Sequence, residues 1–264
     1  MNLLNIAIKA SLEAGEEIMN VYNTSNFEVE TKNDDSPLTI ADKRANDIII
    51  SYLKQTDIPI ISEENKQMKF SERKQWNKCW IVDPLDGTKE FIKKNGEFTV
   101  NIALVEDGIP ILGVLYVPDF KTLYFTEVAN KKAFKVLLKK HKTPVDDVLK
   151  NASEIKPVKN KGKARIVGSR SHLNEETQKF IDTISESEEV EIVSKGSSLK
   201  FCLVAEGKAD LYPRYAPTME WDTAAGHAIC KAVGVTVTAL PADKPLQYNK
   251  EDLLNPWFLV SNRS

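Results

Sequence analysis

The chain contains the sequence WIVDPLDGTKEF at residues 80–91, and the rest of the sequence is best interpreted from this segment outward. Its first three residues, 80–82, form an apolar run typical of a short buried β-strand, which Asp83 and Pro84 are expected to end. Asp83 and Asp86 then lie in a turn rich in proline and glycine. Carboxylates at the end of a rigid element can serve as oxygen ligands for a cation. A turn without function explains this pattern alone equally well.

Two further acidic segments support a functional interpretation. In ISEEN, residues 61–65, Glu63 follows another expected strand. In MEWDTAAGHAI, residues 219–229, Asp222 lies in the first turn of an expected helix, where a simple helix cap would also explain it. Carboxylates without thiolates or paired histidines select a hard cation such as Mg²⁺. The three clusters together predict a phosphoester hydrolase in which metals activate water and neutralise phosphoryl oxygens.

The first half of the chain is predicted to contain helices and a meandering sheet. Residues 3–22 have small or apolar residues every three or four positions, which predicts a helix with one buried face. A second helix is expected near Thr39, with Asp42 three residues later in capping-box spacing. Asp107 and Gly108 mark a hairpin turn. The expected strands cover residues 80–82, 98–106, 109–117, 121–126 and 133–138.

The second half alternates strands with helices, which indicates α/β layering. The lysine-rich stretch at 131–163 precedes this half and is interpreted as a loop-rich surface segment or domain connection. We therefore expect an N-terminal α+β domain over residues 1–150 and a C-terminal α/β domain over 151–264. The expected strands of the second half are 165–168, 191–194, 209–212, 235–238 and 258–260, and the expected helices are 175–184, 198–205 and 222–232.

Composition argues against several classes of protein. The 264 residues include 36 Lys and Arg against 38 Asp and Glu, so overall charge offers no reason to expect a nucleic-acid or membrane partner. Phe134 is the one Phe, Tyr or Trp among the lysines of 131–163, which argues against a basic patch that binds RNA or a membrane, although that interpretation of the segment remains an alternative. Three scattered cysteines, no signal-peptide pattern and no run of about 18 apolar residues predict a cytoplasmic protein without a membrane span. Peripheral association with the inner face of the cytoplasmic membrane, through the lysine-rich segment, remains an alternative.

The motifs taken together resemble the inositol monophosphatase-like superfamily of Mg²⁺-dependent, lithium-sensitive phosphatases. The resemblance runs from about Lys32 to Gly226. Within the superfamily, four segments are most similar to 3'(2'),5'-bisphosphate nucleotidases of the CysQ type: TKNDDSPLTIAD, NGEFTVNIALVEDGIPILGVLYVP, VGSRSH and GSSLKFCLVAEGKADLYPR. The resemblance implies a layered α-β-α-β-α sandwich of the inositol monophosphatase/fructose-1,6-bisphosphatase type, with the site in the cleft between the two parts.

The resemblance also implies a role for individual residues around the metals. Thr88, paired with Asp42, would orient and help deprotonate the attacking water, and Glu63 belongs to the same catalytic set. Gly87 and the N–H groups after it would hold the scissile phosphate, with Thr88 and Asp222 also at the substrate. The implied ligands of two or three Mg²⁺ ions are the side chains of Glu63, Asp83, Asp86 and Asp222 and the backbone carbonyl of Leu85.

A second group of residues bears on the substrate. The resemblance places His172, Ser197, Lys200 and Arg214 around the nucleotide and its second phosphate, with Arg170 as a weaker candidate. A substrate with two phosphates needs a cationic, hydrogen-bonding region away from the metals, which Lys and Arg can provide.

The reaction that the resemblance implies is hydrolysis of adenosine 3',5'-bisphosphate to AMP and phosphate. It would remove an inhibitory by-product of sulfate activation. The 2',5' isomer and 3'-phosphoadenylyl sulfate would be related substrates. An inositol or sugar monophosphatase on the same fold is the alternative enzyme, and a non-catalytic phosphate- or nucleic-acid-binding protein is the alternative of another class. We expect a small-molecule substrate, no nucleic-acid partner, and a monomer or homodimer.

Overall fold

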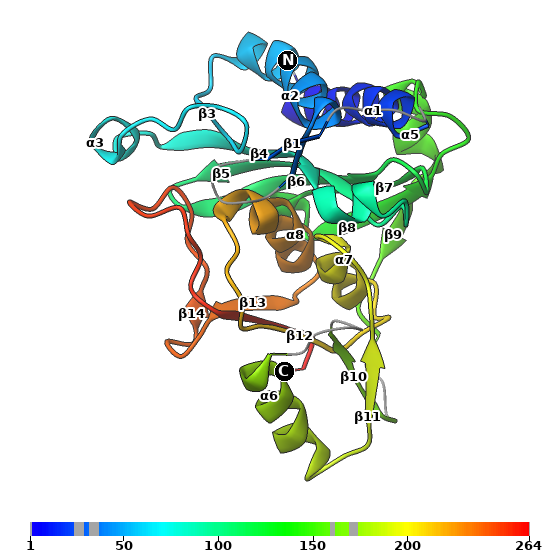
Figure 1. Cartoon of the computed structure of the whole chain (residues 1–264), viewed down its shortest axis with the longest axis vertical. Coiled ribbons are helices and arrows are strands. Elements are labelled where there is room, and N and C mark those ends of the chain that lie inside the picture. The colour runs from blue at the N-terminus through cyan, green and yellow to red at the C-terminus, as the bar shows by residue number, and fades with distance from the viewer. Residues whose placement is uncertain (1, 24–28, 32–36, 159–161, 169–173, 264) are drawn as a thin grey trace.

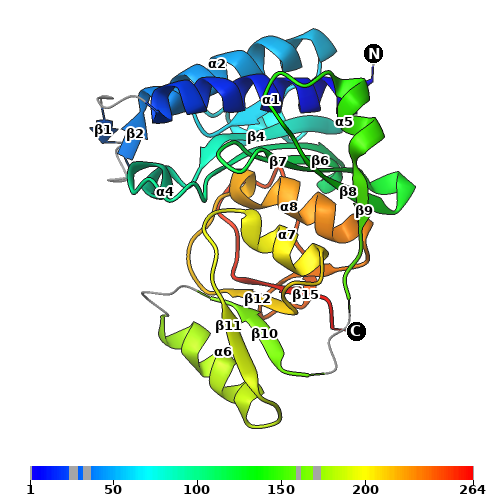
Figure 2. The same ribbon diagram turned by 90° about the vertical axis from the view of Figure 1, so that its right-hand side faces the viewer.

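The structure of the chain is a computed structural model, and it describes residues 2–23, 29–31, 37–158, 162–168 and 174–263. Its helices and two large β-sheets stack as five alternating layers, which follow one another from top to bottom in Figure 1 and Figure 2. The expected layered α-β-α-β-α sandwich is therefore confirmed.

The outermost layer contains two long helices, α1 (Leu3–Tyr22) and α2 (Ile40–Leu53). Their apolar faces pack on the first sheet in one continuous cluster of buried side chains. The helix predicted at residues 3–22 is confirmed, because its apolar residues recur on one helical face. The second helix begins one residue after Thr39 and carries Asp42 in its first turn. The capping role predicted for the Thr39 side chain lies outside the described residues.

Seven strands form the first sheet in the order β3-β4-β5-β6-β7-β8-β9. The pair β3 and β4 is parallel, and the other neighbours are antiparallel. The predicted hairpin turn is confirmed, since Asp107 and Gly108 have positive φ angles of 49° and 75°, as a tight turn between these strands requires. The strands are β3 (Ile60–Ser62), β4 (Lys78–Asp86), β5 (Thr99–Glu106), β6 (Ile109–Val117), β7 (Thr122–Glu127), β8 (Lys132–Leu137) and β9 (Ser153–Ile155).

The prediction that the strand ends at Asp83 is wrong, because β4 continues to Asp86. Asp83 pairs with Asn101 and Asp86 pairs with Thr99, so β4 advances three residues where β5 advances two. The strand thus contains an irregularity of one extra residue, at which Pro84 needs no ladder hydrogen bond. Such a bulge bends the strand and changes the direction of its side chains.

The loop-rich interpretation of residues 131–163 is also wrong. This stretch contains β8, which confirms the strand expected at 133–138, and also the helix α5 (Val145–Asn151) and β9, which were not expected. Buried residues such as Ala133 and Val136 anchor β8, while its lysines form ion pairs at the surface. Lysine is the commonest residue type in this stretch, but the apolar residues between the lysines are enough to complete the sheet. Because β9 belongs to the first sheet, that sheet extends past residue 150, and the division into two domains there stays a prediction.

The second sheet has six strands in the order β11-β10-β12-β15-β13-β14. Helix α6 (Glu175–Ser185) covers its outer face, and α7 (Leu199–Ala205) and α8 (Glu220–Ala232) lie between the two sheets (Figure 2). The strand expected at 209–212 is shifted to 211–214, and the helix expected from 222 begins at Glu220. The strands are β10 (Ala164–Val167), β11 (Val190–Val193), β12 (Leu211–Arg214), β13 (Thr236–Ala239), β14 (Lys244–Pro245) and β15 (Phe258–Ser261).

Two glycines let α8 pack closely enough to bring its first turn to β4. A Cβ atom on Gly113 of β6 would lie 2.6 Å from the carbonyl oxygen of Ala225. A Cβ atom on Gly226 would lie 2.5 Å from the ring of Phe201 in α7. Any larger residue at either position would push the helix away. These contacts fix α8 between the sheets and hence fix the position of Asp222.

The remaining described elements are short: the two-stranded sheet β1 (Val29–Thr31) and β2 (Pro37–Thr39), α3 (Phe70–Arg73), α4 (Thr88–Ile92), and the 3₁₀ helices η1 (Lys54–Thr56) and η2 (Val128–Asn130). Within the described ranges, none of the helices has the length and apolar character that crossing a membrane would require.

Candidate metal and substrate site

Three carboxylates predicted as metal ligands meet in the fold. Asp83 and Asp86 come from the bulged end of β4, and Asp222 comes from the first turn of α8. One oxygen of each carboxylate lies within 4.8 Å of the others. An all-oxygen group of this kind, contributed by a strand and a helix, matches the ligands that a hard cation prefers.

The electrostatics of this acid cluster (Asp83, Asp86 and Asp222) also fit a cation. Burial raises the pKa of Asp83 well above its usual value, and the charges of Glu63, Asp86, Asp222 and Asp42 raise it further. Burial and then the charge of Asp86 raise the pKa of Asp222 to about 8. Buried like charges are costly unless something neutralises them. A divalent ion held by these oxygens would do so.

Glu63 and Asp42 approach the acid cluster from two other elements. Glu63 directly follows β3, and its N–H donates to the carbonyl oxygen of Val82 in β4 at 3.2 Å. Asp42 lies in the first turn of α2 and is 1% exposed. Both raise the pKa of Asp83 through their charge, so both lie close enough to act on it electrostatically. Glu63 is outside the group whose oxygens lie within 4.8 Å, and its role as a metal ligand stays a prediction.

The turn after the acids holds the other predicted residues of the first half. The Leu85 side chain is buried, its N–H donates to Asp83 Oδ1 at 3.0 Å, and its carbonyl oxygen lies 3.5 Å from Thr88 Oγ1. The carbonyl therefore faces the predicted catalytic hydroxyl. Gly87 has φ = 95°, a left-handed conformation that suits glycine, and a Cβ atom there would lie 3.3 Å from Ser197 Cβ. Gly87 thus brings the turn against the loop that precedes α7.

Ser198, which the sequence did not single out, connects the acids of the two halves. Its N–H and its hydroxyl lie 2.6 Å and 2.7 Å from Asp86 Oδ2, and the hydroxyl lies 2.6 Å from the carbonyl oxygen of Asp222. Asn101 Nδ2 donates to the same hydroxyl at 3.0 Å. Ser198 is buried, so these contacts replace water. The only signal in the sequence was its place next to Ser197 in GSSLK.

We expect Ser198→Ala to weaken Mg²⁺ binding by about 10-fold to 100-fold, the range for partners that orient metal ligands. The alanine keeps the N–H contact with Asp86 but loses the hydroxyl that positions the carboxylate. The measurement is calorimetric titration of Mg²⁺ into metal-free protein. Ser187→Ala, which removes an exposed hydroxyl that bonds to the carbonyl of Ile184, is the matched control. Unchanged Mg²⁺ affinity in Ser198→Ala would contradict the assignment.

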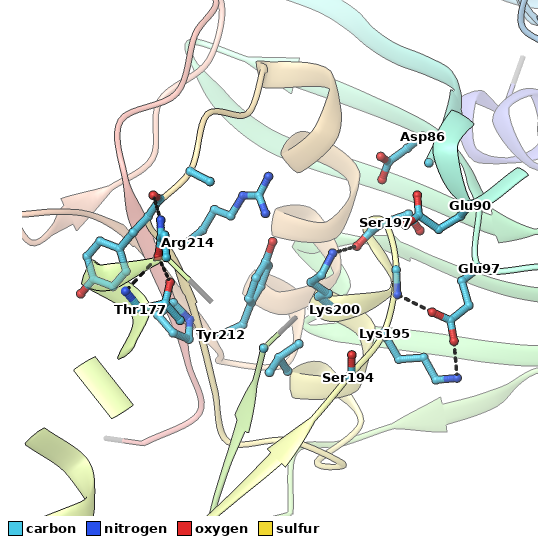
Figure 3. A pocket seen from close by; sticks show the side chains of 18 of the residues that line it. Asp86, Glu90, Glu97, Thr177, Ser194, Lys195, Ser197, Lys200, Tyr212 and Arg214 are labelled. Atoms are coloured by element: carbon cyan, nitrogen blue, oxygen red, sulfur yellow. Dashed lines mark hydrogen bonds and ion pairs between the residues drawn. The ribbon is translucent and has the colours of Figure 1, made fainter. Parts of the chain in front are cut away.

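A cavity of about 550 Å³ adjoins the acid cluster. Figure 3 shows Asp86 at one end of this cavity and Arg214 toward the other, with Ser197 and Lys200 between them. Ser197 has φ = 46°, and its buried hydroxyl has no hydrogen-bond partner among the described residues. A buried hydroxyl without a partner on the wall of a cavity can bond to a ligand.

Both predicted cations line this cavity. Lys200 Nζ donates to the carbonyl oxygen of Ser197 at 3.0 Å. Arg214 Nη2 donates to the carbonyl oxygen of Pro217 at 3.2 Å, and its buried Nε has no partner in the described structure. The charge of Arg214 also lowers the pKa of Asp222, against the larger effects of burial and Asp86. His172 and Arg170 lie outside the described residues.

Glu97 and Lys195 are further residues that the sequence did not indicate. Glu97 Oε1 pairs with Lys195 Nζ at 3.0 Å, and Glu97 Oε2 accepts from the N–H of Gly196 at 2.7 Å (Figure 3). A Cβ atom on Gly196 would lie 2.9 Å from Glu97 Cβ, so the two segments are in close contact. This carboxylate holds the loop that presents Ser197. Residues 97 and 195 are too far apart in the sequence for any local pattern to pair them.

Comparisons with known proteins agree with this architecture. The model of the inositol monophosphatase family matches residues 1–263. The chain is 44% identical to 3'(2'),5'-bisphosphate nucleotidase CysQ of Salmonella typhimurium over 263 residues, covering 98% of this chain and 99% of that one. The identity to the CysQ of Escherichia coli K12 is 43% over the same length and coverage.

Solved structures show the same similarity. The crystal structure of CysQ from Bacteroides thetaiotaomicron superposes with a TM-score of 0.88 at 48% identity, covering 98% of this chain and 97% of that chain. An IMPase from Thermotoga maritima superposes with a TM-score of 0.75 at 24% identity, covering 99% and 92%, and at this identity it supports the fold alone.

Proposed function

The chain belongs to the inositol monophosphatase family, and from its similarity to CysQ proteins within that family we infer that it is a 3'(2'),5'-bisphosphate nucleotidase, which hydrolyses adenosine 3',5'-bisphosphate to AMP and phosphate. The observation that carries the inference is the near full-length similarity to CysQ proteins, together with an acid cluster that opens on a cavity lined by Lys200 and Arg214. The reaction would remove the bisphosphate nucleotide left by sulfate activation. We propose the 2',5' isomer and 3'-phosphoadenylyl sulfate as related substrates, and a cytoplasmic location, with which the three buried free thiols are consistent.

The protein is a metal-dependent phosphatase, and we propose Mg²⁺ as its ion, in two or three copies. Bound there, Mg²⁺ would acidify the attacking water and neutralise charge on the phosphoryl oxygens. The proposed ligands are the carboxylates of Glu63, Asp83, Asp86 and Asp222 and the carbonyl oxygen of Leu85.

The chain's own residues orient the water and the phosphate. We propose that Thr88 Oγ1 accepts a hydrogen bond from the attacking water and that Asp42 takes up its proton. Their support is the place of Thr88 beside the Leu85 carbonyl and the charge that Asp42 exerts on Asp83. The water oxygen forms a bond to phosphorus and the bond from phosphorus to the ribose 3'-oxygen breaks. The ribose 3'-oxygen takes up one proton from solvent water and leaves as a hydroxyl, which balances the proton that Asp42 receives and later returns to solvent. Gly87 and the amides after it hold the phosphate.

The cavity beyond Ser197 would hold the nucleoside and the second phosphate. Lys200 and Arg214 supply two positive charges on one wall, which suits a phosphate that is not hydrolysed. We keep His172 in this group as a proposal. Lys200 and Arg214 favour a bisphosphate as the substrate, because an inositol or sugar monophosphate has no second phosphate for these cations to bind. The buried acid cluster argues against a non-catalytic binding protein, because unneutralised carboxylates only destabilise a fold.

A panel of substrates tests the function directly. We expect Mg²⁺-dependent phosphate release to be fastest with adenosine 3',5'-bisphosphate, slower with inositol 1-phosphate and fructose 1,6-bisphosphate, and absent with AMP. AMP is the control that retains only the phosphate expected to stay bound, and EDTA provides the blank. Preference for inositol 1-phosphate would overturn the substrate assignment but keep the metal chemistry. Phosphate release from none of the compounds would overturn both.

A further inference from the structure

Tyr212 in β12 presents a phenol hydroxyl to the substrate cavity from an otherwise buried ring. The residue is 5% exposed. Its ring makes edge contacts with Phe201 and Phe258, at centroid distances of 5.4 Å and 5.7 Å. Tyr212 also lines the cavity that adjoins the acid cluster. Among the described residues, none hydrogen-bonds its hydroxyl, so the polar end of the side chain is available to a ligand.

The hydroxyl lies between two of the cations that line the cavity, Lys200 and Arg214. Figure 3 shows Tyr212 with Lys200 on one side and Arg214 on the other, and its hydroxyl end points the same way as the Arg214 guanidinium. Tyr212 and Arg214 are two positions apart in one strand, so their side chains leave the same face of the sheet. The ammonium of Lys200 is 5.8 Å from the centre of the Tyr212 ring. Two positive charges and a donor without a partner in the described part of the chain therefore share one wall.

A chain of contacts joins this wall to the acid cluster. Gly87 directly follows Asp86 and packs against Ser197, the carbonyl of Ser197 accepts from Lys200, and Lys200 lies over the Tyr212 ring. Ser197 and Lys200 thus lie between Tyr212 and Asp86, as Figure 3 shows. A ligand group that reaches the Tyr212 hydroxyl must extend away from the phosphate at the metals.

We propose that the Tyr212 hydroxyl determines specificity by donating a hydrogen bond to the phosphate that is not hydrolysed. This inference rests on the proposed nucleotidase function. A phosphate oxygen is a charged acceptor, and hydrogen bonds to charged acceptors are stronger than those between neutral groups. The aromatic contacts already hold the ring in place, so little side-chain freedom is lost on binding. Lys200 and Arg214 supply charge, and Tyr212 adds a donor of fixed position.

Tyr212→Phe tests the proposal because it removes the hydroxyl and keeps the ring. The quantity to compare is the ratio of kcat/KM for adenosine 3',5'-bisphosphate to kcat/KM for 3'-AMP, which lacks the second phosphate. We expect this ratio to fall by about 10-fold to 100-fold in the variant, in line with loss of a hydrogen bond to a charged group. Inhibition by AMP, which keeps the 5'-phosphate, should weaken by a similar factor, whereas inhibition by adenosine should not.

Tyr124→Phe is the matched control. Tyr124 is buried like Tyr212, but its hydroxyl bonds to Glu206 Oε1 at 3.1 Å, and the residue does not line the cavity. An unchanged substrate ratio in Tyr212→Phe, or an equal loss with both substrates, would overturn the role in recognising the second phosphate. Failure of the nucleotidase function itself would be visible separately, because the wild-type protein would then show no preference for the bisphosphate over 3'-AMP.

Discussion

Asp83→Asn should abolish phosphate release and at the same time stabilise the metal-free protein. The amide keeps the shape of the side chain but removes a charge from the acid cluster, so turnover should fall by more than about 100-fold, as when one preorganised electrostatic group is lost. Asp83 is 1% exposed, and burial and neighbouring acids raise its pKa well above the usual value. A neutral residue avoids the free-energy cost of burying a carboxylate beside other acids, so the folded state becomes more stable.

The measurements are Mg²⁺-dependent turnover and the thermal midpoint in EDTA. The midpoint should rise by several degrees, since about 1 kcal/mol corresponds to about 2–4 °C in a chain of this size. Asp252→Asn is the control, because that carboxylate is exposed and its one contact, with the N–H of Leu254, can be kept by asparagine. Full turnover in Asp83→Asn, or a lower midpoint in EDTA, would show the assignment of Asp83 to be wrong.

The stability of the metal-free protein should decrease as the pH rises from about 4 to about 8. The pKa of Asp222 in the fold is raised from 3.8 to about 8, and that of Asp83 is also raised. A carboxyl with a raised folded pKa binds its proton more tightly in the folded state than in the unfolded state. Its contribution to stability is therefore complete below the unfolded pKa and is lost as the pH passes through the folded pKa. The loss is at most about 1.4 kcal/mol per pH unit for each group.

Thermal midpoints between pH 5 and 9, with EDTA and with Mg²⁺, measure this effect. The curve in EDTA should fall with pH, and the separation between the two curves should widen, because Mg²⁺ binds the deprotonated carboxylates. Asp222→Asn should make the EDTA curve less steep, since it removes one of the carboxyls of the acid cluster whose pKa is raised. A metal-free protein whose stability rises between pH 5 and 8 would contradict the raised pKa values.

Most of the local structure was predictable because it depends on short-range periodicity. The helix over residues 3–22 and the hairpin at Asp107 and Gly108 follow from side-chain spacing and from turn residues. Predictions of local structure were wrong where the composition of a segment, or a single proline, suggested a loop or a strand end that the fold does not have. Within 131–163 the strand expected at 133–138 was found as β8, but the lysines masked the helix α5 and the strand β9. Pro84 was expected to end β4, although a bulge accommodates it.

The candidate site also has a part that the sequence predicted and a part that depends on the fold. The residue types in DPLD and WDTAAG already predicted Asp83, Asp86 and Asp222 as one chemical group, because carboxylates at the ends of elements are a recognisable pattern. That the three oxygens lie within 4.8 Å depends on the bulge in β4 and on the close packing of α8.

The sequence by itself thus determined the family, the chemistry of the acids and the kind of substrate, since these depend on which residues occur in which order. Only the tertiary structure revealed Ser198 between Asp86 and Asp222, Glu97 holding the loop before α7, and Tyr212 between Lys200 and Arg214. Ser198 and Glu97 acquire these roles through partners about a hundred residues away in the sequence. Tyr212 is close to Lys200 and Arg214 in the sequence, but only the fold places all three around one cavity. Such arrangements are set by how layers pack, and no periodicity along the chain encodes them.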